Sequence, residues 1–281
     1  MTELISVIVS TYNREDALDA VLRSLAHQSD RNFEVIVADD GSGPPTAQLV
    51  DAWKPRIARR VEHVWHTDQG FRLAEIRNRA ILVSQGAYCI FLDGDCIVRE
   101  DFVATHRGLA EHGWFVTGNR SLLSSELTAK VIRENLTPET WGSARWLTER
   151  WRGGINRLSG LVQLPLGPLR RIRHSAWRGA RACNLAVWRG DLDRVDGFDA
   201  DYKGWGKEDS DFIVRLLRTG VRRKDGVFAT GVIHLWHPEA DRSQLPENES
   251  KLSAVIGGGR VRAQRGLSWL QNASAGKMAM G

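Results

Sequence analysis

Mainly apolar runs of strand length alternate with helix-like segments through the first part of the chain. These runs are residues 5–10, 33–38, 61–65 and 87–92. After the first run, Leu18, Val21, Leu22 and Leu25 recur on one face of a helix whose first turn holds Glu15 and Asp16. Residues 46–53 and 72–84 are expected to form further helices. Strands and helices that alternate in this way predict an α/β fold with a mostly parallel central sheet flanked by helices.

The pattern changes at residue 120. Residues 120–178 mix Trp and Arg with a short apolar piece that Gly and Pro interrupt. On either side we expect a helix at 100–112 and a strand at 114–118, an ordered pattern that resumes at 182–188, and a helix that begins at Glu208 and is closed by Gly220. Residues 231–238 follow another strand-like run. This pattern predicts a single domain over 1–240, divided into a half at 1–119, an insertion at 120–178 and a half at 179–240. Residues 241–281 are expected to be a loosely held C-terminal tail.

The composition is that of a globular protein. The chain has 281 residues, of which 42% are hydrophobic and 26% charged, and no apolar run approaches the length that crosses a bilayer. Residues 1–4 lead into the first strand without a basic leader, so we expect a cytoplasmic protein. Cys89, Cys96 and Cys183 are widely spaced and form no Cys-x-x-Cys, which indicates neither a disulfide framework nor a thiolate zinc site.

Positive charge is concentrated in residues 145–181, which hold nine arginines and one acid. Trp and Arg around a short apolar segment are typical of a surface that lies on an anionic membrane, and we expect such a peripheral contact here. An insertion packed on the domain and a nucleic-acid patch are the alternatives.

Three polar clusters fall where predicted strands end, at 11–13, 39–42 and 93–95. Because open parallel sheets bind ligands at the carboxyl ends of their strands, we expect these clusters to share one site. Asp93 and Asp95 lie two apart, so a continuing strand would point both carboxylates toward one divalent cation or one sugar nucleotide. A loop with two solvated acids is the alternative.

No glycine-rich dinucleotide or P-loop motif is present, so a bound pyrophosphate would need a cation, Arg or both.

Two later clusters carry further candidate chemistry. Glu208 and Asp209 open a helix directly after Gly204–Gly206, where Trp205 could stack on a sugar whose hydroxyls bond to the carboxylates. Acids at a helix start are otherwise ordinary capping residues. His234 and His237 could offer imidazole nitrogen to a metal that carboxylates already hold, although a pair of His is more often structural.

These motifs together resemble inverting glycosyltransferases of the GT-A fold, family 2, with a second half similar to bacterial chondroitin-type and β-1,4-galactosyltransferase-like enzymes. The matching segments are Val7–Arg14, Asp39–Ser42, Asp68–Arg72 with Arg77 and Asn78, Asp93–Asp95, Gly204–Asp209 and His234–His237. They cover residues 5–238 apart from 120–178. The resemblance implies that 1–119 binds a nucleotide sugar and that 179–240 binds the acceptor.

The resemblance also implies a role for each site residue. Nucleotide-sugar contacts are implied for Thr11, Tyr12, Asn13, Asp40, Arg77, Asp93 and Gly94, and acceptor contacts for Asn184, Trp205 and Gly206. Tyr12 would stack on uracil, Asp40 would accept the ring N–H, and Arg77 would lie near the diphosphate. Asp95 with His237 or His234 would hold Mn²⁺ or Mg²⁺, and an imidazole ligand favours Mn²⁺.

The implied reaction is a single displacement. Asp209 would take a proton from the acceptor hydroxyl while Glu208 orients a substrate, and the anomeric centre of an α-linked UDP-sugar would invert. Because Asp209 lies in the first turn of a helix, we expect its pKa to be low.

The chain departs from the family in two places. It lacks the Gln-x-x-Arg-Trp of processive synthases, which favours transfer of one sugar, and Lys207 stands where the galactosyltransferase-like enzymes usually have Gly. We expect a glycan or glycolipid acceptor at the inner face of a bacterial membrane, in surface polysaccharide or lipopolysaccharide assembly.

Two other kinds of protein are weighed against this interpretation. A sugar nucleotidyltransferase would carry a Gly-rich, Arg-containing loop after the first strand, where this chain has Thr11–Arg14. A non-catalytic carbohydrate- or nucleic-acid-binding module has no need of both an Asp-x-Asp and an acid pair beside a Trp. No nucleic-acid partner is expected.

Overall fold

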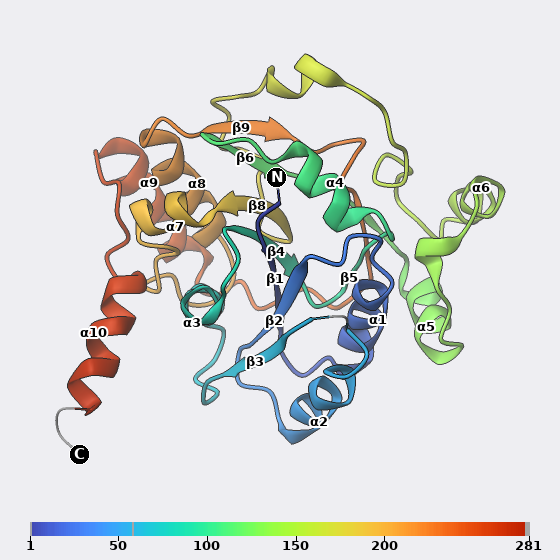
Figure 1. The fold of residues 1–281 in the computed structure, drawn as a ribbon, viewed down its shortest axis with the longest axis horizontal. Coiled ribbons are helices and arrows are strands. Elements are labelled where there is room, and N and C mark those ends of the chain that lie inside the picture. The colour runs from blue at the N-terminus through green and yellow to red at the C-terminus, as the bar shows by residue number, and fades with distance from the viewer. Residues whose placement is uncertain (1, 58, 279–281) are drawn as a thin grey trace.

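The computed structural model describes residues 2–57 and 59–278. Its seven-stranded central sheet has the order β3-β2-β1-β4-β8-β6-β9 (Figure 1). The strands are β1 (Ile5–Thr11), β2 (Phe33–Asp39), β3 (Val61–Trp65), β4 (Tyr88–Asp93), β6 (Trp114–Thr117), β8 (Asn184–Trp188) and β9 (Arg222–Asp225). Within this sheet β8 runs antiparallel to its neighbours β4 and β6, and the other pairs are parallel. The predicted α/β class with a mostly parallel sheet is confirmed.

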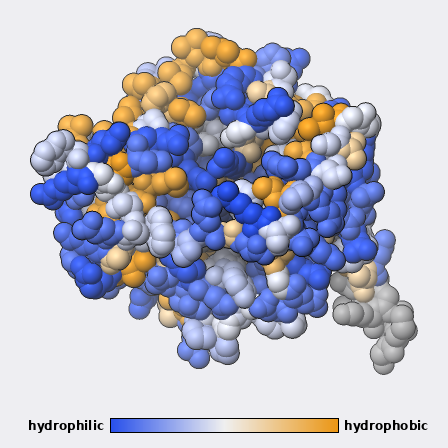
Figure 2. Space-filling view, turned by 180° about the vertical axis from the view of Figure 1, so that it is seen from behind, coloured by the Kyte–Doolittle hydropathy of each residue, from blue (hydrophilic) through white to orange (hydrophobic). Residues whose placement is uncertain are grey.

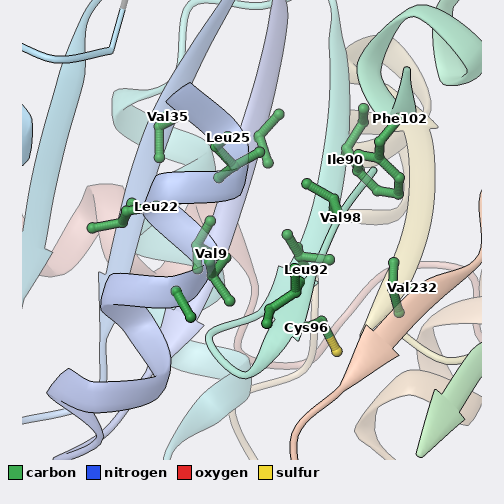
Figure 3. Close-up of a cluster of buried hydrophobic side chains, with 14 of the residues drawn as sticks. Val9, Leu22, Leu25, Val35, Ile90, Leu92, Cys96, Val98, Phe102 and Val232 are labelled. Carbon is green, nitrogen blue, oxygen red and sulfur yellow. The ribbon is translucent and has the colours of Figure 1, made fainter. Parts of the chain in front are cut away.

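Alternate residues of the central strands enter cores on opposite faces of the sheet. Val7 and Val9 of β1 belong to one core and Ile8 to the other. Figure 3 shows the first core, where Val9 and Leu92 of the sheet belong to the same cluster as Leu22 and Leu25 of the helix that covers this face. The flanking helices are α1 (Glu15–Ala26), α2 (Pro44–Trp53), α3 (Leu73–Val83), α4 (Phe102–Leu109), α7 (Arg189–Val195) and α8 (Glu208–Arg218).

A second, three-stranded sheet was not predicted. It has the order β5-β10-β7, formed by β5 (Cys96–Ile97), β10 (Val232–His234) and β7 (Arg120–Leu122). Strands of two or three residues leave almost no periodic signal in a sequence. The pairing matters for the site because it sets His234 opposite Cys96, one residue after Asp95.

The insertion at 120–178 contains more regular structure than its sequence indicates. It holds β7, α5 (Ser125–Arg133), the 3-10 helix η1 (Pro138–Thr140), α6 (Ser143–Trp151) and the 3-10 helix η2 (Gly167–Arg171). Leu127, Val131, Trp146 and Ile155 are buried in the first core. Part of the insertion is therefore packed on the domain, which was one of the alternatives.

The expectation of a loosely held tail is wrong for most of residues 241–278. Two helices follow residue 241, α9 (Leu245–Gly257) and α10 (Leu267–Met278). Leu252 and Val255 pack against Val214 of α8, and Arg260 pairs with the buried Asp199 and Asp211. No helix in the described part of the chain is long and apolar enough to span a membrane.

Candidate active site

The Asp-Gly-Asp turn is fixed against the end of β1. β4 ends at Asp93, and the Gly94 N–H donates to the Ser10 carbonyl at 2.7 Å. A Cβ on Gly94 would lie 2.8 Å from that oxygen, so a larger residue does not fit here. The turn therefore holds the two carboxylates at the edge of the sheet.

Four potential metal ligands meet at this turn. One ligand atom each from Asp93, Asp95, Cys96 and His234 lies within 4.8 Å of the others. His234 Nε2 is 3.4 Å from Asp95 Oδ1. Its Nδ1 is buried without a hydrogen-bond partner among the described residues, and burial lowers the pKa of His234, which favours the neutral imidazole that binds metals. The donor set therefore fits a divalent cation.

His237 faces the same carboxylate from solvent. Its Nε2 lies 3.5 Å from Asp95 Oδ2, and its side chain is 40% exposed. Both histidines of the motif thus approach Asp95. Cys96 was not foreseen as a member of the group, although it directly follows Asp95; burial raises the pKa of its thiol, which makes it a weak ligand.

The acid pair opens α8 on the other side of the site. Asp209 Oδ2 accepts from the Ala182 N–H at 2.9 Å, and Asp209 Oδ1 accepts from Arg77 Nη1 at 3.0 Å. Burial raises the pKa of Asp209 despite Arg77. Burial and the neighbouring Asp209 carboxylate raise the pKa of Glu208. The expected low pKa of Asp209 is therefore wrong, because desolvation outweighs Arg77 and the Ala182 N–H, which both lower this pKa.

Arg77 of α3 connects the two acidic clusters. Its side chain is 2% exposed. Nη2 donates to Asp93 Oδ1 at 3.2 Å and Nε to Ser10 Oγ at 3.3 Å, while Nη1 bonds Asp209. The expected position near a diphosphate is compatible with this geometry, whereas no motif in the sequence indicated the bond to Asp209.

The first strand end presents an exposed aromatic ring. Tyr12 is 47% exposed. Its hydroxyl donates to Asp68 at 2.8 Å, and this bond raises the pKa of Tyr12. Asn13 Oδ1 accepts from the Gly43 N–H at 3.0 Å, which ties the ends of β1 and β2 together. Thr11 is buried, and its hydroxyl has no partner in the described part of the chain.

Asp40 is engaged by groups that the sequence motifs did not indicate. Its Oδ1 bonds His66 Nε2 at 2.7 Å and its Oδ2 accepts from the Arg72 N–H at 2.8 Å. His66 also lies 3.8 Å from Glu75. Burial lowers the pKa of His66, but bonds to the two carboxylates outweigh it and raise that pKa to about 9. A carboxylate has further lone pairs, so Asp40 can still accept a third bond.

The three residues expected to contact the acceptor lie in different surroundings. Trp205 is 39% exposed, and the Arg242 guanidinium lies 5.0 Å from its ring centroid. Gly206 adjoins it with φ of +105°. Asn184 is instead fully buried and bonds His106, Asn119 and Thr230. Its amide stabilises the sheet edge and is not accessible to an acceptor.

Two family models match the chain. "Glycosyl transferase family 2" matches residues 6–161, and "N-terminal domain of galactosyltransferase" matches residues 172–237.

Among curated relatives, validoxylamine A glucosyltransferase of Streptomyces hygroscopicus subsp. limoneus is 30% identical over 236 residues, covering 78% of this chain and 49% of the relative. Chondroitin synthase of Pasteurella multocida (strain Pm70) is 26% identical over 226 residues, covering 77% and 23%. The chain thus spans about half the length of the first relative and less of the second.

Solved structures share the fold. S. aureus TarS 1–349 in complex with UDP-GlcNAc superposes with a TM-score of 0.60 at 17% identity, covering 90% of this chain and 66% of that one. The mannosyltransferase PcManGT from Pyrobaculum calidifontis, in complex with GDP-Man and Mn²⁺, gives 0.56 at 16% identity, covering 100% and 81%.

Proposed function

The chain belongs to glycosyl transferase family 2, and we propose that it is a metal-dependent inverting enzyme that moves one hexose or N-acetylhexosamine from a UDP-sugar to a glycan or glycolipid. Bacterial surface polysaccharide or lipopolysaccharide synthesis is the proposed setting. The observation that carries the proposal is Arg77, which joins the Asp-Gly-Asp turn to the acid pair through bonds of 3.2 Å to Asp93 and 3.0 Å to Asp209. The Arg77 guanidinium thereby holds the turn of the proposed donor site next to the candidate base Asp209.

The donor half of the site is assigned from groups that converge on the carboxyl ends of β1, β2 and β4. Tyr12 stacks on the uracil and Asp40, with His66 behind it, accepts the ring N–H. Thr11, Asn13 and Gly94 line the nucleotide. Asp95 and His234, joined by His237 and Asp93, hold Mn²⁺ or Mg²⁺, which when bound neutralises charge on the diphosphate. Two proteins of the same fold support this assignment, since PcManGT binds GDP-Man with Mn²⁺ and TarS binds UDP-GlcNAc.

The acceptor half supplies the proton transfer. Trp205 and Gly206 form the surface under the acceptor sugar, and Glu208 orients a sugar hydroxyl. Asp209 removes the proton from the attacking hydroxyl as its oxygen bonds to the anomeric carbon, while the bond to the diphosphate breaks and its electron pair leaves with UDP. A raised pKa suits Asp209 to this step because a stronger base takes a proton more readily.

The decisive experiment measures Mn²⁺-dependent UDP release from a panel of UDP-sugars, with candidate acceptors. Asp95→Ala and Asp209→Asn are assayed beside the wild type. We expect Asp209→Asn to lower kcat by about 100-fold or more, and Asp95→Ala to raise the Mn²⁺ concentration needed for activity. Wild-type rates in both variants would refute the proposal.

We further propose that the lipid-facing part of residues 145–181 is a short exposed edge at 162–173. Val162, Leu164, Leu169 and Ile172 are 43%, 44%, 60% and 72% exposed. Figure 2 shows apolar residues along the upper edge, where the segment around η2 lies in Figure 1. Arg171 and Arg173 are exposed beside them. Apolar side chains among arginines suit an anionic bilayer surface.

Arg170 does not belong to this surface. It is buried and donates to the carbonyls of Leu164, Asp225, Val227 and Phe228, so it fixes the edge to the domain. Sedimentation with phosphatidylglycerol vesicles should weaken for Leu169→Ser, Ile172→Ser and Arg173→Ser. The matched control is Ile256→Ser, which alters an exposed apolar residue on α9. If Leu169→Ser, Ile172→Ser and Arg173→Ser all sediment with the vesicles as strongly as the wild type and Ile256→Ser, the membrane contact is refuted.

A further inference from the structure

The loop that carries Trp205 contains three residues with a positive φ, and one of them is not glycine. Gly204 and Gly206 have φ of +67° and +105°. Lys207, the next residue, also has a positive φ of 78°, a region that residues with a Cβ rarely occupy. Such conformations persist only where the surroundings hold them. Contacts beyond the loop must therefore stabilise it.

Those contacts come from the first half of α9. Asn248, which is 1% exposed, donates from Nδ2 to the Lys203 carbonyl at 2.9 Å. Lys251 Nζ donates to the Asp201 carbonyl at 2.7 Å. Glu249 Oε1 pairs with Lys207 Nζ at 3.0 Å. Three residues within one turn of α9 thus bind successive parts of residues 201–207.

The loop and the start of α9 are also in close van der Waals contact. A Cβ on Gly204 would lie 2.7 Å from the Gln244 side chain, and one on Gly206 would lie 3.2 Å from Leu245. On its other side, the Gly204 N–H donates to the Phe71 carbonyl at 3.0 Å. The loop is therefore held between α9 and the residues that precede α3.

The same loop leads directly into the acid pair. The Lys207 carbonyl accepts from the Asp211 N–H at 2.9 Å and so forms the first turn of α8, where Glu208 and Asp209 lie. A shift of Lys207 would move Trp205 on one side and Asp209 on the other. Lys207 is also the position at which this chain departs from the family's glycine.

We infer that the first half of α9 is a positioning element for the acceptor loop, and that the side chains of Asn248 and Glu249, the latter through Lys207, fix the relative placement of Trp205 and Asp209. The hold of α9 on the loop is independent of any activity, whereas its effect on acceptor binding rests on the proposed function. The C-terminal segment is thereby assigned a role in the site.

Amide hydrogen exchange of the whole protein tests the hold on the loop without a ligand. Asn248→Ala should speed exchange at residues 203–209 by about tenfold, because it removes a buried hydrogen bond. Glu249→Gln should speed it by about twofold to fivefold, since it removes a partly exposed ion pair. Ser253→Ala is the matched control, because it removes a bond within α9, from Ser253 Oγ to the Glu249 carbonyl. Unchanged exchange in Asn248→Ala and Glu249→Gln would overturn the inference.

Kinetics test the effect on the acceptor, with the donor and acceptor that the UDP-release panel selects. Glu249→Gln should raise the acceptor KM by about twofold to fivefold and leave the UDP-sugar KM unchanged. Faster loop exchange with an unchanged acceptor KM would overturn the positioning role. A panel with no transfer at all would refute the proposed function, while the exchange data would still decide whether α9 holds the loop.

Discussion

Arg77 Nη1 donates a hydrogen bond to Asp209 Oδ1 at 3.0 Å, between residues 132 positions apart in the chain. The same guanidinium reaches Asp93 at 3.2 Å, and Glu208 lies 3.6 Å from it. One buried cation thus balances three carboxylates that belong to different parts of the proposed reaction. Because a planar guanidinium has several donors in a fixed arrangement, it can bond Asp93 and Asp209 at once.

Replacement of Arg77 should therefore affect both stability and turnover. Arg77→Gln leaves the buried Glu208 and the partly buried Asp93 and Asp209 without a cation, so we expect the free energy of unfolding to fall by about 3 kcal/mol. Arg77→Lys keeps the charge but cannot bond both partners, and kcat should fall by about tenfold or more. Urea unfolding and UDP-release assays measure the two effects. Arg79→Lys, on the same helix but paired with Glu75, should keep its kcat, and an Arg77→Lys variant with wild-type kcat would contradict the prediction.

β1, β2 and β4 could be predicted because burial on both faces of a parallel sheet leaves mainly apolar runs, and the edge strand β3 could be predicted although it is only partly buried. Residues 61–65 match β3 residue for residue, β1 and β2 each extend one residue beyond the predicted run, and β4 is shifted by one residue at both ends. The small sheet and α9 were missed for different physical reasons. Strands as short as Cys96–Ile97 carry no period, and the packing of α9 on α8 depends on a partner more than thirty residues away.

The residues of the site were easier to predict than their bonds. Asp95 and His234 were chosen for their chemistry, and the structure brings them together. The link from Arg77 to Asp209 and the position of His66 between Asp40 and Glu75 depend on tertiary contacts that no spacing reveals. The low pKa expected for Asp209 failed for a related reason, since burial is a property of the folded chain.

The acid side of the pH–rate profile should report the proposed base Asp209, whose side chain is 20% exposed. Burial raises the pKa of Asp209 from its ordinary value, and a general base acts only as the carboxylate. We therefore expect kcat/KM to rise with pH through this raised pKa. The loss of activity on acidification should begin above about pH 4, the ordinary pKa of an aspartate. Circular dichroism at each pH separates this loss from acid unfolding. A profile that stays flat down to about pH 4 would contradict the raised pKa.

The two histidines should contribute unequally to cation affinity. His234 is buried within the four-ligand group, whereas His237 is 40% exposed. We expect His234→Ala to weaken Mn²⁺ binding, measured by calorimetry with UDP present, by about 100-fold and His237→Ala by about tenfold. His27→Ala is the control, since this ring caps the end of α1 through a bond to the Arg23 carbonyl. If both histidine variants bind Mn²⁺ like the wild type, Asp95 has other co-ligands.

Stability should also depend on pH through His66. Its pKa is raised to about 9 by Asp40 and Glu75, and His66 lowers that of Glu75 to about 2. Protonated His66 therefore stabilises the fold fully below its unfolded pKa of about 6.5, and this contribution is lost as pH rises through about 9. The contribution of Glu75 is present above about 4.5 and is lost as pH falls through about 2.

His66→Gln should consequently be destabilised most at pH values where His66 of the wild type is protonated and Glu75 is ionised. We expect a loss on the order of 2 kcal/mol in the free energy of unfolding near pH 6, and a much smaller difference from the wild type near pH 10, where wild-type His66 is neutral. Urea unfolding across this range measures the difference. His174→Gln, which changes an exposed histidine, should follow the wild type at every pH. A destabilisation of His66→Gln that does not vary between pH 6 and 10 would show that the ring acts through packing and not through its charge.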